Sequence, residues 1–566
     1  MPIFAAQALA NLSRRPPSYT RGRPRRPLNR PSVGHGVNDS IFPNAIGISQ
    51  VSKAVNFDMS PDGQLDTRGG GIKLTDTAVA STGESPELHQ FIKRETDGTL
   101  TLKTMLKSGT VLYGYNTSTG VFDSVQTGLS TDRASMINFV NAAGAEVMLY
   151  ADGSNFIMYD GSTVTNIASN YTAGNAASAP RYIFAKHNVC FAVEDDNPDV
   201  LFFCDLLAPN SNWPSQGFLI LEGGIDRITG IGEIYDYVLV TTLNSVYIIT
   251  GRTRSQFALI KVNSTNGCTS HHSIVSHEGF VYWANQSGFK IGKLRRADSD
   301  GMEVEHISNN IQNTFEEGKD GFWNNIVGTY HSEKKSIYWT MKAAASDQPD
   351  RLFAYSVIRS RPELPPPDHP GPDLRFVWSG YYEGYNFNAV KVIEDSTGKD
   401  ELYVADEAGL VYLMHSGYKD KRAVGASTGT DVSYEIRGRE ETRGGAGREF
   451  RIMTFLPLFY QQHNGGFNVQ FLVNRSQLVP SSAVTVSFRG NIPYYNDGTV
   501  ASVTTLWGSS VWSLRPVLNA KISLKTKVFS VIPLIKSSGS NPKEEGTWVG
   551  CSWIIQDFPV VQGKAA

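Results

Sequence analysis

The sequence feature that most constrains the fold is a strand–turn–strand unit that recurs along the middle of the chain. Its clearest copy spans residues 147–161, where two apolar or aromatic runs flank Asp152-Gly153 and a second Asp-Gly pair closes the unit. Asp-Gly supplies the positive φ that a tight hairpin turn needs. Comparable units begin near residues 147, 189, 237, 280, 336 and 401. The chain is therefore expected to be all-β.

The spacing of these units favours a β-propeller. Successive units are 42, 48, 43, 56 and 65 residues apart, and four-stranded propeller blades repeat about every 40–50 residues. Loop insertions account for the longer gaps, and the longest gap contains the Pro-rich stretch 361–372. Hairpins of a β-sandwich could be spaced in the same way, because no fixed blade signature is present. We predict a propeller over residues 37–426 and leave its blade count open.

The pattern changes after about residue 427. Longer alternating strands are expected at 431–437, 449–459, 467–473 and 483–488. Long antiparallel strands of this kind are typical of a sandwich or barrel. Residues 427–566 are therefore predicted to form a separate β-sandwich-like domain.

The first 36 residues form a third region, rich in Arg and Pro. Proline disfavours helices and central strands, so we predict an extended arm. The segment 1–30 contains no acidic residue, whereas the rest of the chain has 45 basic and 54 acidic residues, a net charge of −9. Clustered arginines can contact nucleic-acid phosphates or the acidic surface of a neighbouring subunit. The candidate contact residues for a partner or DNA are Arg14, Arg15, Arg21, Arg23, Arg25, Arg26 and Arg30.

No motif indicates catalysis, a cofactor or a metal. The sequence lacks a Walker A loop, HExxH and the GxSxG nucleophile elbow. The Gly-rich stretch 69–71 is interpreted as a turn. His271 and His272 are adjacent; on a strand they would point to opposite faces, so a polar loop is favoured over a metal site. We therefore expect no enzyme activity and no catalytic residue, cofactor or metal ligand.

Neither a secretory signal nor a membrane span is expected. The charges of the N-terminus follow its apolar stretch rather than precede it, and no run approaches 18 apolar residues. The four cysteines are widely spaced, which is typical of buried free thiols.

Two stretches carry a resemblance to a known family. Within 55–74, the residues Asn56, Gly63, Leu65, Arg68 and Gly70 match a pattern found near the start of tail proteins of short-tailed bacteriophages. Within 228–315, a series of short apolar strands and turns, from ITGI at 228 to the isoleucine at 311, follows the same order as in that family. The chain thus resembles tail nozzle proteins, also called packaged-DNA stabilisation or tail tubular B-like proteins.

The resemblance implies a virion structural protein, located in the tail and assembled in the host cytoplasm. Such proteins form a homo-oligomeric ring, for which the resemblance suggests a hexamer, below the portal and adaptor and in contact with fibres or tip proteins. The ring channel retains packaged double-stranded DNA and releases it at infection. An acidic body would keep the duplex from adhering. The sequence assigns no channel-lining residues.

Two other functions stay open from the sequence. The first is a carbohydrate- or receptor-binding propeller of a tail or surface protein, in which exposed tryptophans stack on sugars. Its candidates are Trp213, Trp323, Trp378 and Trp512. The second is a propeller hydrolase, for which no pair of carboxylates stands out.

Overall fold

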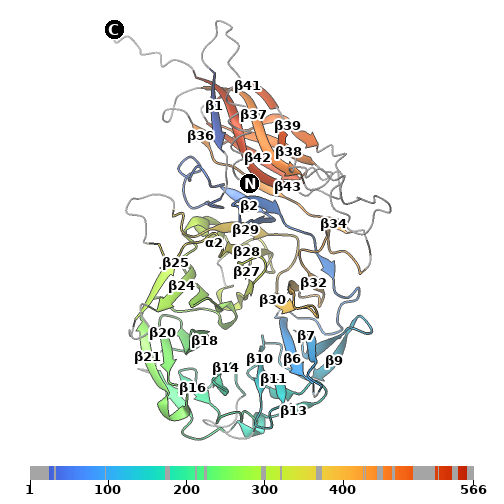
Figure 1. Ribbon diagram of the computed structural model, residues 1–566, viewed down its shortest axis with the longest axis vertical. Helices are drawn as coiled ribbons and strands as arrows, with labels where there is room; N and C mark the ends of the chain where they lie inside the picture. Colours follow the sequence, from blue (N-terminus) through green and yellow to red (C-terminus); the bar gives the residue numbers. More distant parts are fainter. Residues whose placement is uncertain are drawn as a thin grey trace, which may run out of the picture.

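The computed structural model is made of short antiparallel strands that form a ring, with a second β domain attached to one side of it (Figure 1). It describes residues 25–30, 34–83, 85–95, 97–171, 179–210, 213–221, 226–294, 301–318, 322–364, 373–417, 419–424, 426, 429–442, 450–461, 466–487, 517–519, 522–528, 530–537 and 546–557. Within these residues no helix is both long enough and apolar enough to cross a membrane.

The ring is a β-propeller whose described part contains seven four-stranded blades. Blade 1 consists of β6 (Glu87–Arg94), β7 (Leu100–Ser108), β8 (Val111–Asn116) and β9 (Val121–Thr127). Blade 2 consists of β10 (Ser135–Val140), β11 (Glu146–Ala151), β12 (Phe156–Tyr159) and β13 (Val164–Asn166). Blade 3 consists of β14 (Tyr182–Lys186), β15 (Val189–Val193), β16 (Val200–Phe203) and β17 (Phe218–Ile220).

The other blades follow in chain order. Blade 4 consists of β18 (Ile228–Ile234), β19 (Tyr237–Thr242), β20 (Val246–Thr250) and β21 (Ala258–Asn263). Blade 5 consists of β22 (Val275–His277), β23 (Phe280–Asn285), β24 (Gly288–Leu294) and β25 (Met302–His306). Blade 6 consists of β26 (Gly328–His331), β27 (Ser336–Met341), β28 (Arg351–Ser356) and β29 (Trp378–Tyr382). Blade 7 consists of β30 (Ala389–Glu394), β31 (Asp400–Ala405), β32 (Val411–Leu413) and β5 (Ile72–Lys73).

The ring closes by sharing a blade between the two ends of the propeller sequence. The outermost strand of blade 7 is β5, which pairs antiparallel with β32 through Tyr412↔Lys73 and Leu413↔Ile72. The innermost strands contact one another in the closed order β6, β10, β14, β18, β22, β26, β30 and back to β6. Closure in this way ties an early strand to a late one, so neither end of the ring is left as a free sheet edge.

The six repeating units expected from the sequence are the second strands of blades 2 to 7. These strands are buried on both faces; β15 and β27, for example, are buried at every residue. Burial on both faces demands an uninterrupted apolar run, which makes such a strand conspicuous in a sequence. The second strand of blade 1, β7, is exposed at its start and carries two lysines, so its unit escaped the pattern.

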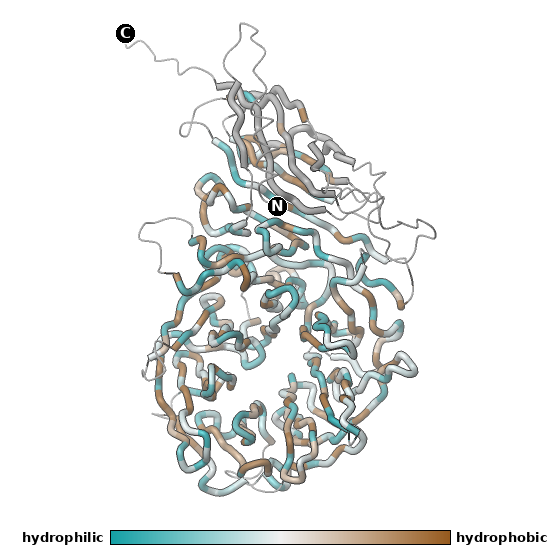
Figure 2. Tube along the Cα trace, in the orientation of Figure 1, coloured by the Kyte–Doolittle hydropathy of each residue, from teal (hydrophilic) through white to brown (hydrophobic). Residues whose placement is uncertain are grey.

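Apolar clusters fill the spaces between neighbouring blades. Figure 2 shows hydrophobic and hydrophilic residues alternating over short stretches around the ring. The largest purely intra-propeller cluster joins blades 2, 3 and 4 and includes Leu149, Phe191 and Val240. Because each blade buries its faces against two neighbours, the ring is held by lateral packing.

The second domain has two facing β-sheets, as in a sandwich, and it contains strands from residues 25–67 as well as from residues 427–566. One of its sheets contains β3 (Phe57–Met59), β4 (Leu65–Thr67), β43 (Gly546–Asp557), β37 (Phe450–Gln461), β40 (Val517–Asn519), β41 (Ile522–Val528) and β1 (Arg25–Arg30). The facing sheet contains β2 (Lys53–Val55), β35 (Glu435–Arg437), β36 (Glu441–Thr442), β42 (Ser530–Ser537), β38 (Gly466–Val473) and β39 (Gln477–Ser487). The rings of Phe455 and Phe471 meet edge-on between the sheets, 5.1 Å apart.

Propeller and sandwich share one continuous sheet. Blade 6 does not end at β29, because β29 pairs parallel with β2 at Tyr381↔Val55, and β2 pairs antiparallel with β35. Blade 6 therefore extends into a ten-stranded sheet that forms one layer of the sandwich. The other six blades are separate four-stranded sheets. The backbone ladder itself, in addition to side-chain packing, joins the two domains.

The N-terminal residues differ from their expected placement. Strands β2, β3 and β4 lie in the range 37–426 expected for the propeller, yet they pair with sandwich strands. Part of the expected extended arm, β1, pairs antiparallel with β43 of the same chain, from Arg25↔Gln556 to Arg30↔Cys551. Both differences arise from pairing between residues 380–531 positions apart, which local patterns do not encode.

Candidate functional site

A cavity of about 320 Å³ lies on the propeller axis. Its lining comes from the innermost strands and from the turn that precedes blade 5. The innermost strands all begin at the same face of the propeller. We call this the entrance face. The loops that lead into each innermost strand and the turns between second and third strands lie there, as the topology of a four-stranded blade requires. All seven blades contribute at least one residue to the lining.

His271 is half-buried and lines this cavity, where its ring contacts residues of blades 2 and 4. It lies in a short 3₁₀ turn, His271–Ser273, that precedes blade 5. Its Nδ1 accepts a hydrogen bond from the backbone N–H of Ile231 at 3.2 Å, so a neutral ring carries its proton on Nε2. That nitrogen lies 3.3 Å from Ser135 Oγ, which in turn donates to the carbonyl of Ile183. Burial, followed by the charge of Lys391, lowers the pKa of His271 to about 4.

A buried ion pair holds the junction between blades 7, 1 and 2. Arg133 Nη1 donates to Glu87 Oε2 at 2.9 Å and to the Pro86 carbonyl at 2.7 Å. Its Nη2 donates to the carbonyl of Asn388, just before blade 7, at 2.9 Å. Burial raises the pKa of Glu87 in spite of the adjacent guanidinium. His272 Nδ1 lies 3.7 Å from Glu87 Oε2, and burial, followed by His271 and Arg133, holds the pKa of His272 well below its usual value.

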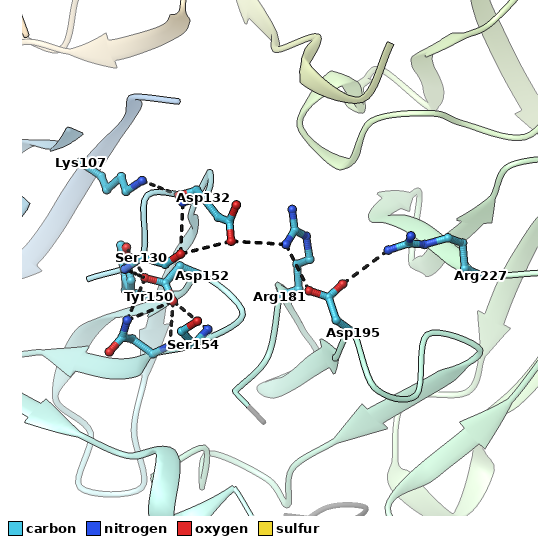
Figure 3. A network of polar contacts seen from close by, with 10 residues as sticks. Lys107, Ser130, Asp132, Tyr150, Asp152, Ser154, Arg181, Asp195 and Arg227 are labelled. Atoms are coloured by element: carbon cyan, nitrogen blue, oxygen red, sulfur yellow. Dashed lines mark hydrogen bonds and ion pairs between the residues drawn. The ribbon is translucent and has the colours of Figure 1, made fainter. Parts of the chain in front are cut away.

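A chain of alternating charges crosses the entrance face from blade 1 to blade 4 (Figure 3). Arg181 contacts Asp132 at 3.8 Å and Asp195 at 3.1 Å, and Asp195 contacts Arg227 at 3.4 Å. Lys107 donates to the backbone carbonyl of Asp132. Burial, as the largest effect, lowers the pKa of Lys107 to about 8.

Asp152 anchors the same network from its turn in blade 2 (Figure 3). Its Oδ1 accepts the backbone N–H groups of Ser154 and Asn155, at 2.9 and 2.7 Å. Its Oδ2 accepts from the Ser130 backbone and the Tyr150 hydroxyl, each at 2.9 Å. The carboxylate is thus saturated by local donors and fixes two loops, and the expected Asp-Gly turn is present, with Gly153 at φ +85°.

The joint between propeller and sandwich is built around Arg68, whose side chain is fully buried. A guanidinium has five N–H donors, and each one is used. Nε donates to Asn56 Oδ1 at 2.8 Å. The terminal nitrogens bind both carboxylate oxygens of Asp420, at 2.8 and 2.6 Å, and the carbonyls of Gly69 and Glu383, each at 2.9 Å. Arg68 therefore links the start of the chain to the end of the propeller.

The neighbours of Arg68 explain other residues of the 55–74 stretch. Asn56 stands at φ +63°, where the chain passes from β2 in one sandwich sheet to β3 in the other, and its side-chain amide donates to the Ser433 carbonyl at 2.6 Å. A Cβ on Gly70 would lie 2.2 Å from the Lys419 carbonyl oxygen. The expectation of a turn at 69–71 is wrong: these residues form no turn, and Gly71 N–H donates to Lys419 O at 3.0 Å. Glycine is required there by close backbone approach.

A second polar cluster lies beside the joint. Asp58 binds Lys334 Nζ at 3.1 Å and accepts a hydrogen bond from the Tyr382 hydroxyl, while His415 Nδ1 lies 3.6 Å away. Burial alone would raise the pKa of Asp58, but Lys334, His415 and Tyr382 outweigh it and lower the pKa to about 2. The cluster is a stable anion–cation arrangement between β3 and blade 6.

The polar clusters described above hold loops and strands in place. Among the described residues, no group of three or more His, Cys, Asp or Glu side chains is arranged to hold a metal ion. Cys190, Cys204 and Cys268 are buried free thiols, and burial raises the pKa of Cys268 to about 11. The charged groups at the entrance face and the joint mainly bind loops and strands to one another.

The structure places the sequence candidates as follows. Arg14, Arg15, Arg21 and Arg23 lie outside the described residues, and Arg25, Arg26 and Arg30 are on β1. His271 and His272 are half-buried in a short 3₁₀ turn of the loop that precedes blade 5. Trp213 and Trp378 are buried at 2% and 0% exposure, Trp323 is half-buried against the core, and Trp512 lies outside the described residues.

Sequence reasoning missed the residues that gather on the axis. Glu87, His89 and Lys391 are polar residues on innermost strands, and Arg133 precedes one. A titratable residue that interrupts an apolar strand, such as the lysine within AVKVIE at 389–394, is the signal that marks such positions. Asp420 had no such signal, because its partner Arg68 is 352 positions away.

Comparison with known proteins gives likenesses to solved structures only; no family model and no curated protein matches the chain. BBS1N, from its crystal structure in complex with ARL6DN, has a TM-score of 0.32 at 12% identity, over 54% of this chain and 88% of that one. A chain of the mitotic checkpoint complex has a TM-score of 0.33 at 10% identity, over 70% and 96%. The extracellular domain of the hybrid two-component system BT4673 from B. thetaiotaomicron has a TM-score of 0.32 at 12% identity, over 64% of this chain and 50% of that one. None of these matches bears on function.

Proposed function

We propose that this chain is a non-catalytic structural subunit of the tail of a short-tailed bacteriophage, a nozzle or hub protein that assembles into a ring. The observation that carries the proposal is the joint around Arg68. Three residues of the stretch that resembles the tail proteins, Asn56, Arg68 and Gly70, come together there and lock the propeller to the sandwich. A subunit that must keep its shape under load in a ring benefits from two domains joined by one sheet and one saturated buried ion pair.

The polar clusters of the propeller support a structural role in the same way. The carboxylates of Asp152 and Asp195 and the guanidiniums of Arg133 and Arg181 are engaged by neighbouring loops. A catalytic acid or base needs access to a substrate. These groups are used to fix blades.

The size of the axial cavity indicates where DNA would pass. A duplex about 20 Å wide with a rise of about 3.4 Å fills roughly 1,000 Å³ per base pair, whereas the whole axial cavity measures about 320 Å³. The proposed DNA channel therefore runs between subunits of the ring, with each propeller beside it. The net charge of −9 outside the arm would limit adhesion of the duplex.

In the proposed assembly, the adaptor and portal lie above the ring, and fibres or tip proteins contact its other faces. The ring is homo-oligomeric, with six copies suggested by the resemblance. The Arg/Pro arm ties the subunit to a neighbour or to the ring above. Its basic residues suit an acidic protein surface better than the channel wall, since tight phosphate contact would hinder DNA exit.

Electron microscopy of the purified full chain, and of phage particles that contain it, tests this proposal. We expect a closed ring with an axial opening at least about 20 Å wide, and antibody labelling at the tail end of the particle. A chain that is absent from particles, or a ring whose axis is sealed in every state, contradicts the proposal.

The arm has its own test. Replacing Arg14, Arg15, Arg21 and Arg23 by Ala should weaken subunit association in analytical ultracentrifugation while the circular dichroism spectrum stays unchanged. A matched control replaces Arg252 by Ala, because that arginine is exposed on blade 4 and paired only locally with Asp236. Unchanged association of the arm variant would refute the tie between subunits. A fall in DNA binding with a reduced salt dependence would instead assign the arm to phosphate contact.

The second candidate function, a carbohydrate- or receptor-binding propeller, needs exposed tryptophans, and the structure supports fewer of them than the sequence suggested. Two of its four tryptophans, Trp213 and Trp378, are buried, and their indole N–H groups donate to the carbonyls of Pro209 and Ile307. A saturable response on a glycan array that disappears in a Trp323→Ala variant would favour this function over the tail subunit.

A further inference from the structure

We propose that the axial cavity of the propeller binds a small oxyanion, a phosphate or a carboxylate, through the ammonium group of Lys391 and the ring of His272. This inference does not depend on the proposed tail function, because it rests on the lining of the cavity alone.

The first argument is the uncompensated charge of Lys391. This residue lies on β30 and lines the cavity. Within the described residues its ammonium forms no ion pair and no hydrogen bond. The two carboxylates of the lining are already engaged, Glu87 by Arg133 at 2.9 Å and Glu233 by Lys186 at 2.6 Å. The charge of Lys391 also acts on Glu87, but Glu87, Glu233, Arg133, Lys186 and Lys391 together carry a net charge of +1, so the cavity has one positive charge in excess.

The second argument is the set of imidazoles that share the cavity with Lys391. Its charge contributes to lowering the pKa of His89, His271 and His272, after the larger effect of burial. These imidazoles come from blade 1 and from the turn before blade 5, whereas Lys391 belongs to blade 7. Lys391 and these three imidazoles line the same cavity, which places its charge close to all of them. An unpaired ammonium in a partly desolvated cavity is costly unless an anion accompanies it.

The third argument is the set of neutral donors around that charge. The ring of His271 is committed to Ser135 and the Ile231 backbone, and His89 is committed to Asn138 at 3.2 Å. His272 makes no hydrogen bond within the described residues, and its Nδ1 lies 3.7 Å from Glu87 Oε2. A neutral imidazole can donate one N–H to an oxyanion.

The size of the cavity fits a small ligand. A volume of about 320 Å³ corresponds to roughly ten water molecules. Phosphate or a short carboxylate fits there with part of its hydration shell. The single unmatched charge suits a ligand of low charge, and a polyanion such as duplex DNA does not fit.

Isothermal titration calorimetry of the full chain tests the site, with inorganic phosphate in one arm and acetate in the other. The ionic strength is held constant with chloride. We expect saturable binding at one site per chain. Lys391→Met should weaken it by about 10- to 100-fold, the usual effect of losing one charge-assisted hydrogen bond, whereas Lys391→Arg should retain it within about threefold because the charge remains. Binding of phosphate alone, or of acetate alone, identifies which oxyanion the site takes.

A matched control comes from the same blade. Lys399 lies in the exposed turn between β30 and β31, where it pairs with Glu401 at 3.9 Å. Lys399→Met should leave oxyanion affinity unchanged. Should Lys391→Met fail to fold, Lys391→Gln keeps a polar head in the cavity and should show the same loss. His272→Ala should also weaken binding. Absence of saturable binding to the wild-type chain, or equal affinity in folded variants of Lys391, overturns the proposal.

Discussion

Removing the charge of Asp420 should strongly destabilise the chain. Asp420→Asn keeps the size of the side chain but replaces one carboxylate oxygen by an NH₂ group. Both carboxylate oxygens now accept N–H groups of Arg68, at 2.8 and 2.6 Å, and Oδ1 also accepts the Tyr385 hydroxyl at 2.8 Å. In the variant, one terminal nitrogen of Arg68 faces a donor, and the guanidinium is left buried without its counter-charge.

The magnitude follows from the burial of the pair. Side-chain exposure is 0% for Arg68 and 6% for Asp420, so water cannot replace the lost partner. Breaking a buried ion pair by removing one charge costs about 3–5 kcal/mol, because the remaining charge stays desolvated. The three other acceptors of Arg68 hold it in place, so it cannot turn toward solvent. We therefore expect a loss of about 3–5 kcal/mol.

Urea denaturation followed by tryptophan fluorescence measures this loss. The matched control is Asp431→Asn, because Asp431 pairs with Lys419, the residue next to Asp420, but is 47% exposed. That control should cost less than about 1 kcal/mol, as surface ion pairs do. Equal unfolding midpoints for Asp420→Asn and Asp431→Asn would refute the reasoning that burial decides the contribution of the Arg68 pair.

Three further changes should have measurable effects. Burial lowers the pKa of His271 to about 4, so the unfolded chain takes up a proton at a higher pH than the folded chain, and the free energy of unfolding falls as the pH drops from 6.5 to 4. In urea denaturation across this range, the His271→Gln variant should lose about 3 kcal/mol less than the wild-type chain. Equal losses in the two chains would contradict this prediction. Gly70→Ala places a Cβ against the Lys419 carbonyl and should cost about 1–3 kcal/mol in the same assay, whereas an unchanged midpoint would show that the backbones can separate. Ile72→Pro should weaken the β5–β32 pairing and speed limited proteolysis in blade 7, with an unaltered digestion pattern as the opposing result.

The propeller could be predicted because its second strands are buried on both faces. An apolar run such as VCFAV at 189–193 recurs once per blade, so the repeat is visible without any long-range information. Blade 1 was not predicted because its second strand, β7, is exposed at its start and contains two lysines. The sequence pattern could therefore predict the fold class but not the number of blades.

The joint and the axial cluster could not be predicted in the same way. Val55 pairs with Tyr381, and Arg68 binds Asp420, so each contact joins residues more than 300 positions apart. A local pattern gives the period of a strand and says nothing of its partner. The resemblance singled out Asn56 and Arg68 without a reason, and their physical role became clear only when the two sheets and Asp420 were seen together.

The shared blade has a consequence for how the chain folds during synthesis. Blade 7 needs β5, which leaves the ribosome early, and β32, made about 340 residues later. At about 5–20 residues per second, β5 waits roughly 15–70 s for its partner. The sandwich waits longer, since β3 and β4 need β43 at 546–557. During that interval the early strands have free edges, open to pairing with other chains. The long-range pairing that closes the finished ring therefore also delays the end of folding. Chaperone binding to residues 53–73 would protect the early strands from pairing with other chains during that delay.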